Sequence, residues 1–139
     1  GLLFSNYASL ALGSDGLVYM AWTDYAPDHG PTHVYFKLST DHGETWPLAA
    51  DQIDHNPGAR GVVEDPPQIA TDNNGNVYIG WAEPSRDGKR ITILLNRSHD
   101  DGATWQDQDQ IISGSSSFWA KFHGSAHWIL NLLLEFGTF

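Results

Sequence analysis

Hydrophobic residues along this chain are gathered in short runs separated by turn-forming residues. The runs "VYMAW" (18–22) and "VYIGW" (77–81) are rich in β-branched and aromatic residues, and they follow "GSDG" and "TDNNGN". "THVYFKLS" (32–39) and "RITILLNRS" (90–98) are two further runs of this kind. Runs of this composition between Gly, Asn and Asp predict β-strands. We therefore expect an all-β fold.

The same pattern of runs occurs twice, 59 residues apart. "GLVYMAW" (16–22) aligns with "GNVYIGW" (75–81) without a change of offset. A shorter run precedes each of these segments, and a segment beginning "DQI" closes each unit. The repeat predicts two units of four short antiparallel strands, which is the pattern of a β-propeller blade.

An octad is the most similar part of the two units: "STDHGETW" (39–46) and "SHDDGATW" (98–105). An Asp at the head of a turn can accept backbone N–H groups, a Gly can adopt positive φ, and a Trp can anchor the turn in a core. We interpret the octad as a tight turn between the third and fourth strands. Its shared residues are Ser39, Asp41, Gly43, Thr45 and Trp46 in the first copy, and Ser98, Asp100, Gly102, Thr104 and Trp105 in the second.

Two other interpretations of the octad are weaker. A calcium loop needs several oxygen ligands at alternate positions, but position 42 is His where position 101 is Asp. A catalytic Asp repeated in each unit is not expected, because one catalytic centre needs one such residue. We predict no metal site and no cofactor.

The octad resembles the Asp-box, also called the bacterial neuraminidase repeat, and the larger unit resembles a blade of the sialidase-like propellers. The resemblance covers residues 9–112 and implies a structural role for the box, remote from any active site. It further implies an exo-sialidase type of glycoside hydrolase that acts on terminal acidic sugars. Because the box also occurs in propellers that are not sialidases, the alternative is a non-catalytic module that binds glycan or protein.

The repeat divides the chain into segments. One blade is expected over 9–53, an inter-blade loop over 54–67 and a second blade over 68–112. Residues 1–8 are read as the end of a preceding blade, and 113–139 as a Ser-rich linker with an irregular, apolar tail that leans towards helix. Because a closed propeller takes about four to eight blades, we expect the chain to be a fragment of a larger, six-bladed ring that is inactive by itself.

Charge narrows the range of partners. The chain carries 17 Asp and Glu against 7 Lys and Arg, a formal net charge of −10. This balance argues against binding to nucleic acid or to an anionic membrane surface, and no apolar run is long enough to span a membrane. The absence of Cys excludes disulfides and thiolate chemistry. The resemblance implies a secreted, cell-surface or periplasmic parent protein with a sialoside-like glycan as its ligand.

Candidate binding residues lie in the longer connections. In a four-stranded meander these connections lie at the end opposite the boxes, and such loops often carry function. For a sialidase-like site, Arg would bind the substrate carboxylate, and a Tyr nucleophile with acidic partners would complete the machinery. The local candidates for catalysis are Arg60, Glu64 and Asp65. The candidates for the substrate face are Asp24, Tyr25, Glu83 and Arg86.

Trp22 and Trp81 could stack on a sugar ring. They occupy the same position in both repeats, each at the end of an apolar strand. We therefore expect them to pack between neighbouring sheets.

Overall fold

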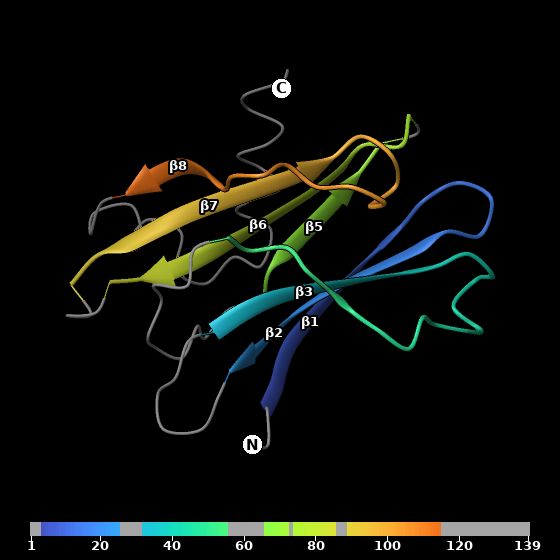
Figure 1. Ribbon diagram of the computed structural model, residues 1–139, viewed down its shortest axis with the longest axis horizontal. Coiled ribbons are helices and arrows are strands. Elements are labelled where there is room, and N and C mark those ends of the chain that lie inside the picture. The colour runs from blue at the N-terminus through green and yellow to red at the C-terminus, as the bar shows by residue number, and fades with distance from the viewer. Residues whose placement is uncertain (1–3, 26–31, 56–65, 73, 86–88, 115–139) are drawn as a thin grey trace.

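The computed structural model describes residues 4–25, 32–55, 66–72, 74–85 and 89–114. These residues form two four-stranded antiparallel sheets, in the strand orders β1-β2-β3-β4 and β5-β6-β7-β8 (Figure 1). No helix occurs among them. The predicted all-β class and the four antiparallel strands of each repeat are thus confirmed. Residues 115–139, the predicted linker and tail, lie outside the described residues.

The strands follow the runs read from the sequence. The first sheet contains β1 (Phe4–Leu12), β2 (Val18–Tyr25), β3 (Thr32–Ser39) and β4 (Asp51–Gln52). The second contains β5 (Gln68–Thr71), β6 (Val77–Pro84), β7 (Ile91–Ser98) and β8 (Gln110–Gly114).

The first strand is longer than the sequence suggested. Phe4 pairs with Tyr25 and Leu12 with Val18, so residues 4–8, expected to end a preceding blade, belong to the same sheet as β2. The pairing shifts between Asn6 and Ser9, where Tyr7 adopts a φ of 52°. This irregularity interrupts the alternation of apolar residues, which explains why the run was read from Ser9 only.

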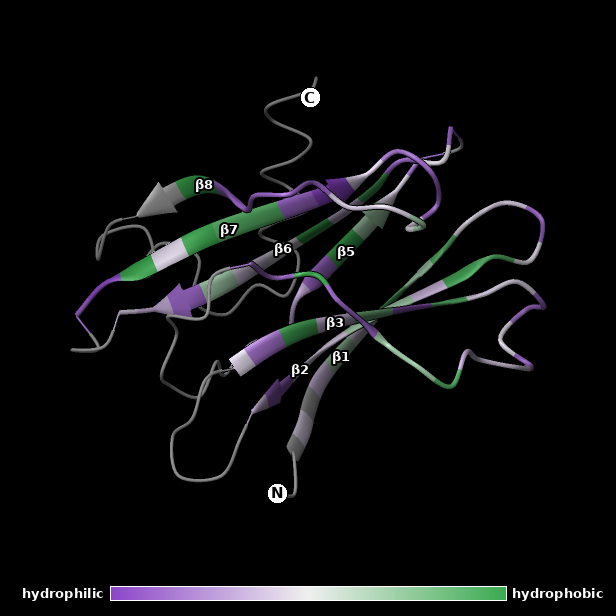
Figure 2. Cartoon of the chain, in the orientation of Figure 1, coloured by the Kyte–Doolittle hydropathy of each residue, from purple (hydrophilic) through white to green (hydrophobic). Residues whose placement is uncertain are grey.

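The core lies between the two sheets. The first sheet contributes Tyr19, Ala21, Val34 and Phe36, which we call its inner face. The second sheet contributes Val77, Ile79, Trp81 and Leu94 to the same cluster. All eight residues are buried, and the colouring by hydropathy shows apolar positions along the middle of the strands (Figure 2). Burial of these side chains is the main force that holds one sheet on the other.

The other side of the first sheet is partly exposed. Strand β2 alternates buried and half-buried residues along its length. The half-buried positions of β2 and their cross-strand neighbours form what we call the outer face: Leu10, Leu12, Val18, Met20, Trp22 and Tyr35. By contrast, consecutive residues of β7 from Ile93 to Asn96 are all buried, so both sides of that strand are covered.

Both box glycines adopt positive φ, as predicted, but their surroundings differ. Gly43 has a φ of 84° and Gly102 a φ of 88°. A Cβ on Gly43 would have its nearest neighbour at 3.9 Å, whereas a Cβ on Gly102 would lie 2.4 Å from the Phe36 ring of the other sheet.

We therefore expect Gly102→Ala to destabilise the protein more than Gly43→Ala. Both variants carry a left-handed backbone cost of about 1–2 kcal/mol. Only Gly102→Ala adds overpacking against Phe36, at about 1–3 kcal/mol. Urea unfolding of the two variants measures the difference, and equal losses of stability would contradict the packing of this box on the first sheet.

Candidate functional site

The two ends of the sheets carry different structures. In both sheets the first hairpin turn and the box lie at one end, and the connection between the second and third strands lies at the other (Figure 1). The expectation that the longer connections gather opposite the boxes is wrong, because the segments 40–50 and 99–109, which contain most of each box, are longer than the connections 26–31 and 85–90.

The box turn is bonded to the first hairpin of its own sheet, because His42 N–H donates to Gly16 O over 2.8 Å and Asp101 N–H donates to Gly75 O over 2.9 Å. We call this the box end, and the opposite end the loop end.

The carboxylate of each box accepts hydrogen bonds from the Thr four residues later, and these bonds close the turn. In the first copy, Asp41 Oδ1 accepts from Thr45 N–H at 2.9 Å, and Asp41 Oδ2 accepts from the Thr45 hydroxyl at 2.5 Å. The Ser39 hydroxyl donates to Asp41 at 2.7 Å and accepts from Gly43 N–H at 2.9 Å. Every shared polar residue of the octad is therefore used inside the turn.

The second copy repeats this geometry closely. Asp100 accepts from Thr104 N–H at 2.8 Å and from the Thr104 hydroxyl at 2.6 Å, and the Ser98 hydroxyl donates to it at 2.6 Å. Gly102 N–H donates to Ser98 Oγ at 2.9 Å, as its counterpart does in the first box. The agreement supports the structural interpretation of the box.

Hydrogen bonds also lower the pKa values of the box carboxyls. The Thr45 hydroxyl, the Thr45 N–H and the Ser39 hydroxyl stabilise the charged form of Asp41 and lower its pKa to about 2. The Ser98 and Thr104 hydroxyls have the same effect on Asp100, whose pKa is also about 2. Such carboxylates stay ionised at neutral pH, so they are poor proton donors.

The second box also packs on the first sheet. The Tyr19 hydroxyl donates to Asp101 Oδ1 at 2.7 Å, across the two sheets. The Trp105 ring meets Phe36 edge-on, with 5.0 Å between the ring centroids. Burial first, and then the bond to Asp101, raise the pKa of Tyr19. The box therefore contributes to the contact between sheets as well as to its own turn.

The loop end carries two of the predicted acidic residues at matched positions. Asp24 pairs with His33 across β2 and β3, and Glu83 pairs with Thr92 across β6 and β7. Tyr25 follows Asp24 at the end of β2. The structure thus brings Asp24, Tyr25 and Glu83 to the loop end, on two sheets. Arg60, Glu64, Asp65 and Arg86 lie outside the described residues.

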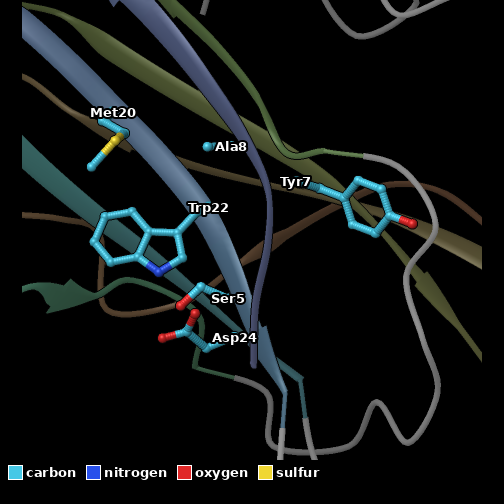
Figure 3. A pocket seen from close by; sticks show the side chains of 6 residues that line it. All are labelled: Ser5, Tyr7, Ala8, Met20, Trp22 and Asp24. Carbon is cyan, nitrogen blue, oxygen red and sulfur yellow. The ribbon is translucent and has the colours of Figure 1, made fainter. Parts of the chain in front are cut away.

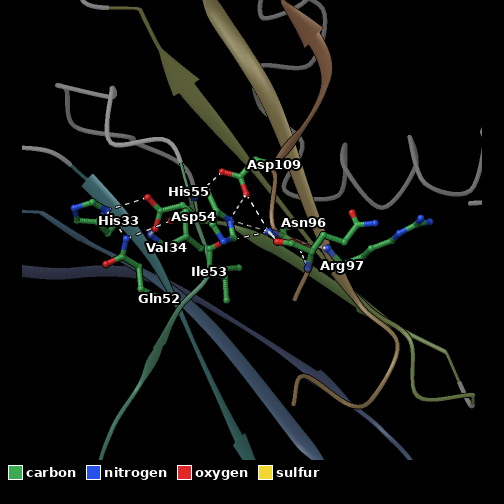
Figure 4. A network of polar contacts seen from close by, with 10 residues as sticks. His33, Val34, Gln52, Ile53, Asp54, His55, Asn96, Arg97 and Asp109 are labelled. Atoms are coloured by element: carbon green, nitrogen blue, oxygen red, sulfur yellow. Dashed lines mark hydrogen bonds and ion pairs between the residues drawn. The ribbon is translucent and has the colours of Figure 1, made fainter. Parts of the chain in front are cut away.

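The segment that follows β4 is hydrogen-bonded to strand β3 near the loop end of the first sheet. Asp54 is buried, and its carboxylate accepts from Val34 N–H at 2.8 Å and contacts His33 Nδ1 at 2.9 Å (Figure 4). Gln52 Nε2 donates to Asp54 O. Both carboxylate oxygens of Asp54 are therefore occupied.

The same segment is bonded to the second sheet. Asn96 is fully buried in β7, and its amide donates to Ile53 O at 3.1 Å and to Asp109 Oδ1 at 3.0 Å (Figure 4). His55 N–H donates to Asp109 Oδ2 at 2.8 Å. Residues 53–55 thus form a polar link between the sheets.

Glu83 lies near this link and has an altered pKa. Burial first, and then the charges of Asp54 and Asp109, raise the pKa of Glu83 above its usual value. Half-burial explains the first effect and repulsion between like charges the second. Among the described acidic residues whose pKa is shifted, Glu83 is the one shifted towards the protonated form.

Tyr35 belongs to the same region. Burial, followed by the charges of Asp24 and Asp54, raises the pKa of its hydroxyl. Its ring stacks on Trp22, with 5.8 Å between centroids and 23° between planes. A raised pKa is the opposite of what an ionised phenolate nucleophile requires, so Tyr35 does not suit that role.

Five residues of this region were not predicted from the sequence as site residues: His33, Asp54, His55, Asn96 and Asp109. Asn96 and Asp109 are bonded across 13 positions of the sequence, and His55 and Asp109 across 54 positions. The one sequence signal was the recurrence of "DQI", which places Asp109 directly before β8. Arg90, which begins the run leading into β7, was also not named. It lies at the loop end and exchanges backbone and side-chain bonds with Ser85.

Trp81 is buried in the core at 5% exposure, as expected for packing between sheets, whereas Trp22 lies on the outer face. On that face Trp22 and Asp24 line a pocket with a volume of about 450 Å³, together with Ser5, Tyr7, Ala8 and Met20 (Figure 3).

Within the described ranges, no three His, Cys, Asp or Glu side chains gather in a way that could hold a metal ion. The described residues also contain no helix long and apolar enough to cross a membrane.

Models of known protein families and the curated proteins were both searched, and neither search finds a match to this chain.

The box carboxylates should make stability depend on pH in strong acid. The folded pKa of Asp41 and Asp100, about 2, is below the usual value of 3.8. Their contribution is therefore complete above pH 4 and is lost as the pH falls towards 2. The double variant Asp41→Asn/Asp100→Asn should melt several degrees lower at pH 7, and the difference from the native chain should shrink by pH 2. Exposed Asp107→Asn is the control, expected to change neither value.

Glu83 should show the opposite dependence. Because its folded pKa is raised, ionisation opposes folding once the pH exceeds the unfolded value of about 4.5. Glu83→Gln should therefore raise the melting temperature at pH 7 by a few degrees and leave it unchanged near pH 3. Thermal melts at the two pH values test this. A lower melting temperature at pH 7 would contradict a repulsive environment around Glu83.

Proposed function

We propose that this chain is two consecutive blades of a sialidase-like β-propeller, and that the complete protein hydrolyses terminal acidic sugars at the loop end of its sheets. The observation that carries the proposal is the environment of Glu83, a half-buried carboxyl with a raised pKa beside Asp54 and Asp109. Glycosidases commonly combine a proton-donating carboxyl of raised pKa with other acidic groups.

Among the residues that the structure describes, the box end offers no rival site. The Asp41 and Asp100 carboxylates are saturated by bonds inside their turns, and their pKa values of about 2 keep them ionised. A ligand contact there would have to break a turn that holds the sheet together. The loop end, by contrast, carries side chains of both sheets on either side of one junction.

Among the residues that the structure describes, Glu83 is the one suited to protonate a leaving-group oxygen. A carboxyl with raised pKa keeps its proton at higher pH, which is what a general acid requires. Repulsion from Asp54 and Asp109 would favour the proton on Glu83 until the substrate accepts it.

The acidic sugar also needs cationic partners. Lys89 and Arg90 are exposed at the start of β7, at the same end as Glu83. A guanidinium binds a carboxylate through two parallel bonds, so Arg90 joins Arg60 and Arg86 as a candidate for that contact. Tyr19 and Tyr35 do not suit the role of the nucleophile that the resemblance implies, because both have raised pKa values. Tyr25 at the loop end and a Tyr of another blade are the remaining candidates.

A non-catalytic module that binds glycan or protein through the loop end is the second candidate. One observation favours it: Asp54 and Asp109 are already bonded through both of their carboxylate oxygens. Groups held in this way provide a rigid frame, which suits recognition as well as it suits chemistry.

Hydrolysis of a fluorogenic sialoside separates the two candidates. The 139-residue chain should show no turnover, and a longer protein that carries these sheets in a complete ring should be active. There, Glu83→Gln should lower kcat by about 100-fold or more. Glu44→Gln is the matched control, because Glu44 is exposed at the box end. Sialoside binding without hydrolysis would favour the recognition module, and full activity of folded Glu83→Gln would refute the role of Glu83.

A further inference from the structure

The turn between β5 and β6, at the box end, contains the pair Asn74–Gly75 (Figure 1). Of the seven Asn in the sequence, Asn74 alone is followed by Gly, and its side chain is exposed. Because Gly has no Cβ, its backbone nitrogen can approach the side-chain carbonyl of the preceding residue closely. An exposed amide directly before a Gly is therefore a place where the chain can react with itself.

The reaction consumes only water. The Gly75 nitrogen attacks Cγ of Asn74, so that a bond forms between these two atoms and the bond from Cγ to the amide nitrogen breaks. The amide nitrogen leaves as ammonia with the proton that the Gly75 nitrogen gives up, and a succinimide ring remains. Water then breaks one of the two bonds that join the Gly75 nitrogen to carbonyl carbons of the ring. Cleavage at Cγ gives Asp, and cleavage at the main-chain carbonyl carbon gives isoaspartate.

Two comparable positions among the described residues are held away from this reaction. Asn96 is fully buried, and its amide donates to Asp109 Oδ1 at 3.0 Å. Asp101 also precedes a Gly, but the Gly102 N–H is buried and donates to Ser98 Oγ at 2.9 Å. A nitrogen that is bonded in this way cannot turn towards a neighbouring carbonyl. The exposed turn between β5 and β6 lacks such burial.

The same turn holds the second box in place. Gly75 O accepts from Asp101 N–H at 2.9 Å, and a Cβ on Gly75 would lie 3.5 Å from Asp101 Oδ2. The side chain of Asp101 also accepts from the Tyr19 hydroxyl of the first sheet at 2.7 Å. A change of the main chain at Asn74 is therefore transmitted through Asp101 to the contact between the sheets.

Both products of the reaction disturb this arrangement. Isoaspartate adds one carbon to the main chain directly before Gly75, which displaces the carbonyl that the Asp101 N–H needs. Either product also adds a carboxylate to a turn that already contains Asp72, whose Oδ1 accepts from Asn74 N–H at 2.8 Å. Like charges at such separations repel each other, whereas the neutral amide of Asn74 does not take part in this repulsion.

The first repeat has a charged residue in the equivalent turn, but a different neighbour. The counterparts of Asn74 and Gly75 are Asp15 and Gly16, and Gly16 O accepts from His42 N–H at 2.8 Å. The box residue that is bonded to the acidic turn is thus a His, and the one bonded to the neutral turn is an Asp. Loss of the Asn74 amide would add a negative charge to a turn that already contacts a negative box residue.

We propose that Asn74–Gly75 is a site of spontaneous deamidation, and that its conversion to isoaspartate loosens the second box and the contact of this box with the first sheet. The reaction needs no enzyme, and its rate rises with pH because the Gly75 nitrogen must lose its proton to attack. The strength of the contact between the sheets therefore falls as the protein ages. The proposal rests on the turn and the box, and it does not depend on the proposed activity.

Peptide mapping by mass spectrometry follows the reaction in the 139-residue chain, stored at pH 6 and at pH 8. Asn74 should convert to Asp and isoaspartate faster than Asn76 of the same turn, which precedes the bulky Val77. Conversion should be faster at pH 8. Asn74→Gln is the matched control. Because ring closure depends on how closely the reacting atoms are placed, the longer side chain should react at least about tenfold more slowly.

A second measurement follows the structure. The isoaspartate form, separated from the unmodified chain by chromatography, should melt a few degrees lower, and its Asp101 amide should exchange hydrogen with solvent faster. Asn74→Asp adds the charge without lengthening the main chain, so it should lose less stability than the isoaspartate form. Asn74→Gln that is stored for the same time should keep its melting temperature.

Four outcomes would overturn the proposal. They are conversion of Asn74 no faster than that of Asn76, an isoaspartate form that melts and exchanges like the unmodified chain, a loss of stability in Asn74→Asp as large as in the isoaspartate form, and an equal loss on storage in Asn74→Gln. Asn76 gives the reference rate within the native chain, so the first outcome needs no variant. None of these measurements involves a sugar, so failure here is distinct from failure of the proposed activity.

Discussion

The bond between the box carboxylate and its Thr is the contact on which each repeat depends. It fixes the turn between the third and fourth strands. That turn then places the N–H of His42 or Asp101 against the first hairpin of the same sheet. Once the turn is fixed, the box Trp can reach outwards, as Trp105 does towards Phe36. The hydrogen bonds inside the box turn therefore determine how one sheet packs on the other.

The sequence was sufficient for the parts of the fold that repeat. Strand order, the box turns and the division into a box end and a loop end follow from two copies of one pattern, and the structure agrees with them. The link through Asp54, Asn96 and Asp109 could not be read in this way, because its bonds join the two sheets. Such pairings depend on how the sheets are laid together, which no local pattern encodes.

The candidate site was predicted only in part, for a similar reason. Asp24 and Glu83 each lie two residues after the Trp that recurs in both repeats, and this position was enough to place them at the loop end. It was not enough to separate them, because their environments depend on what covers each sheet. Glu83 lies beside Asp54 at a covered junction, while Asp24 lines an open pocket. Two residues with one sequence context thus acquire different surroundings.

One-directional stacking also limits how such a protein can grow. Each sheet of this kind covers one neighbour with its inner face and can be covered by another neighbour on its outer face. Such sheets can be added in series, but a linear series always ends with one apolar face exposed to solvent. Only a circular arrangement removes that terminus, by letting the last unit cap the first. The number of units would then be set by the rotation between successive sheets, a geometric property of the junction, and not by the stability of any single unit.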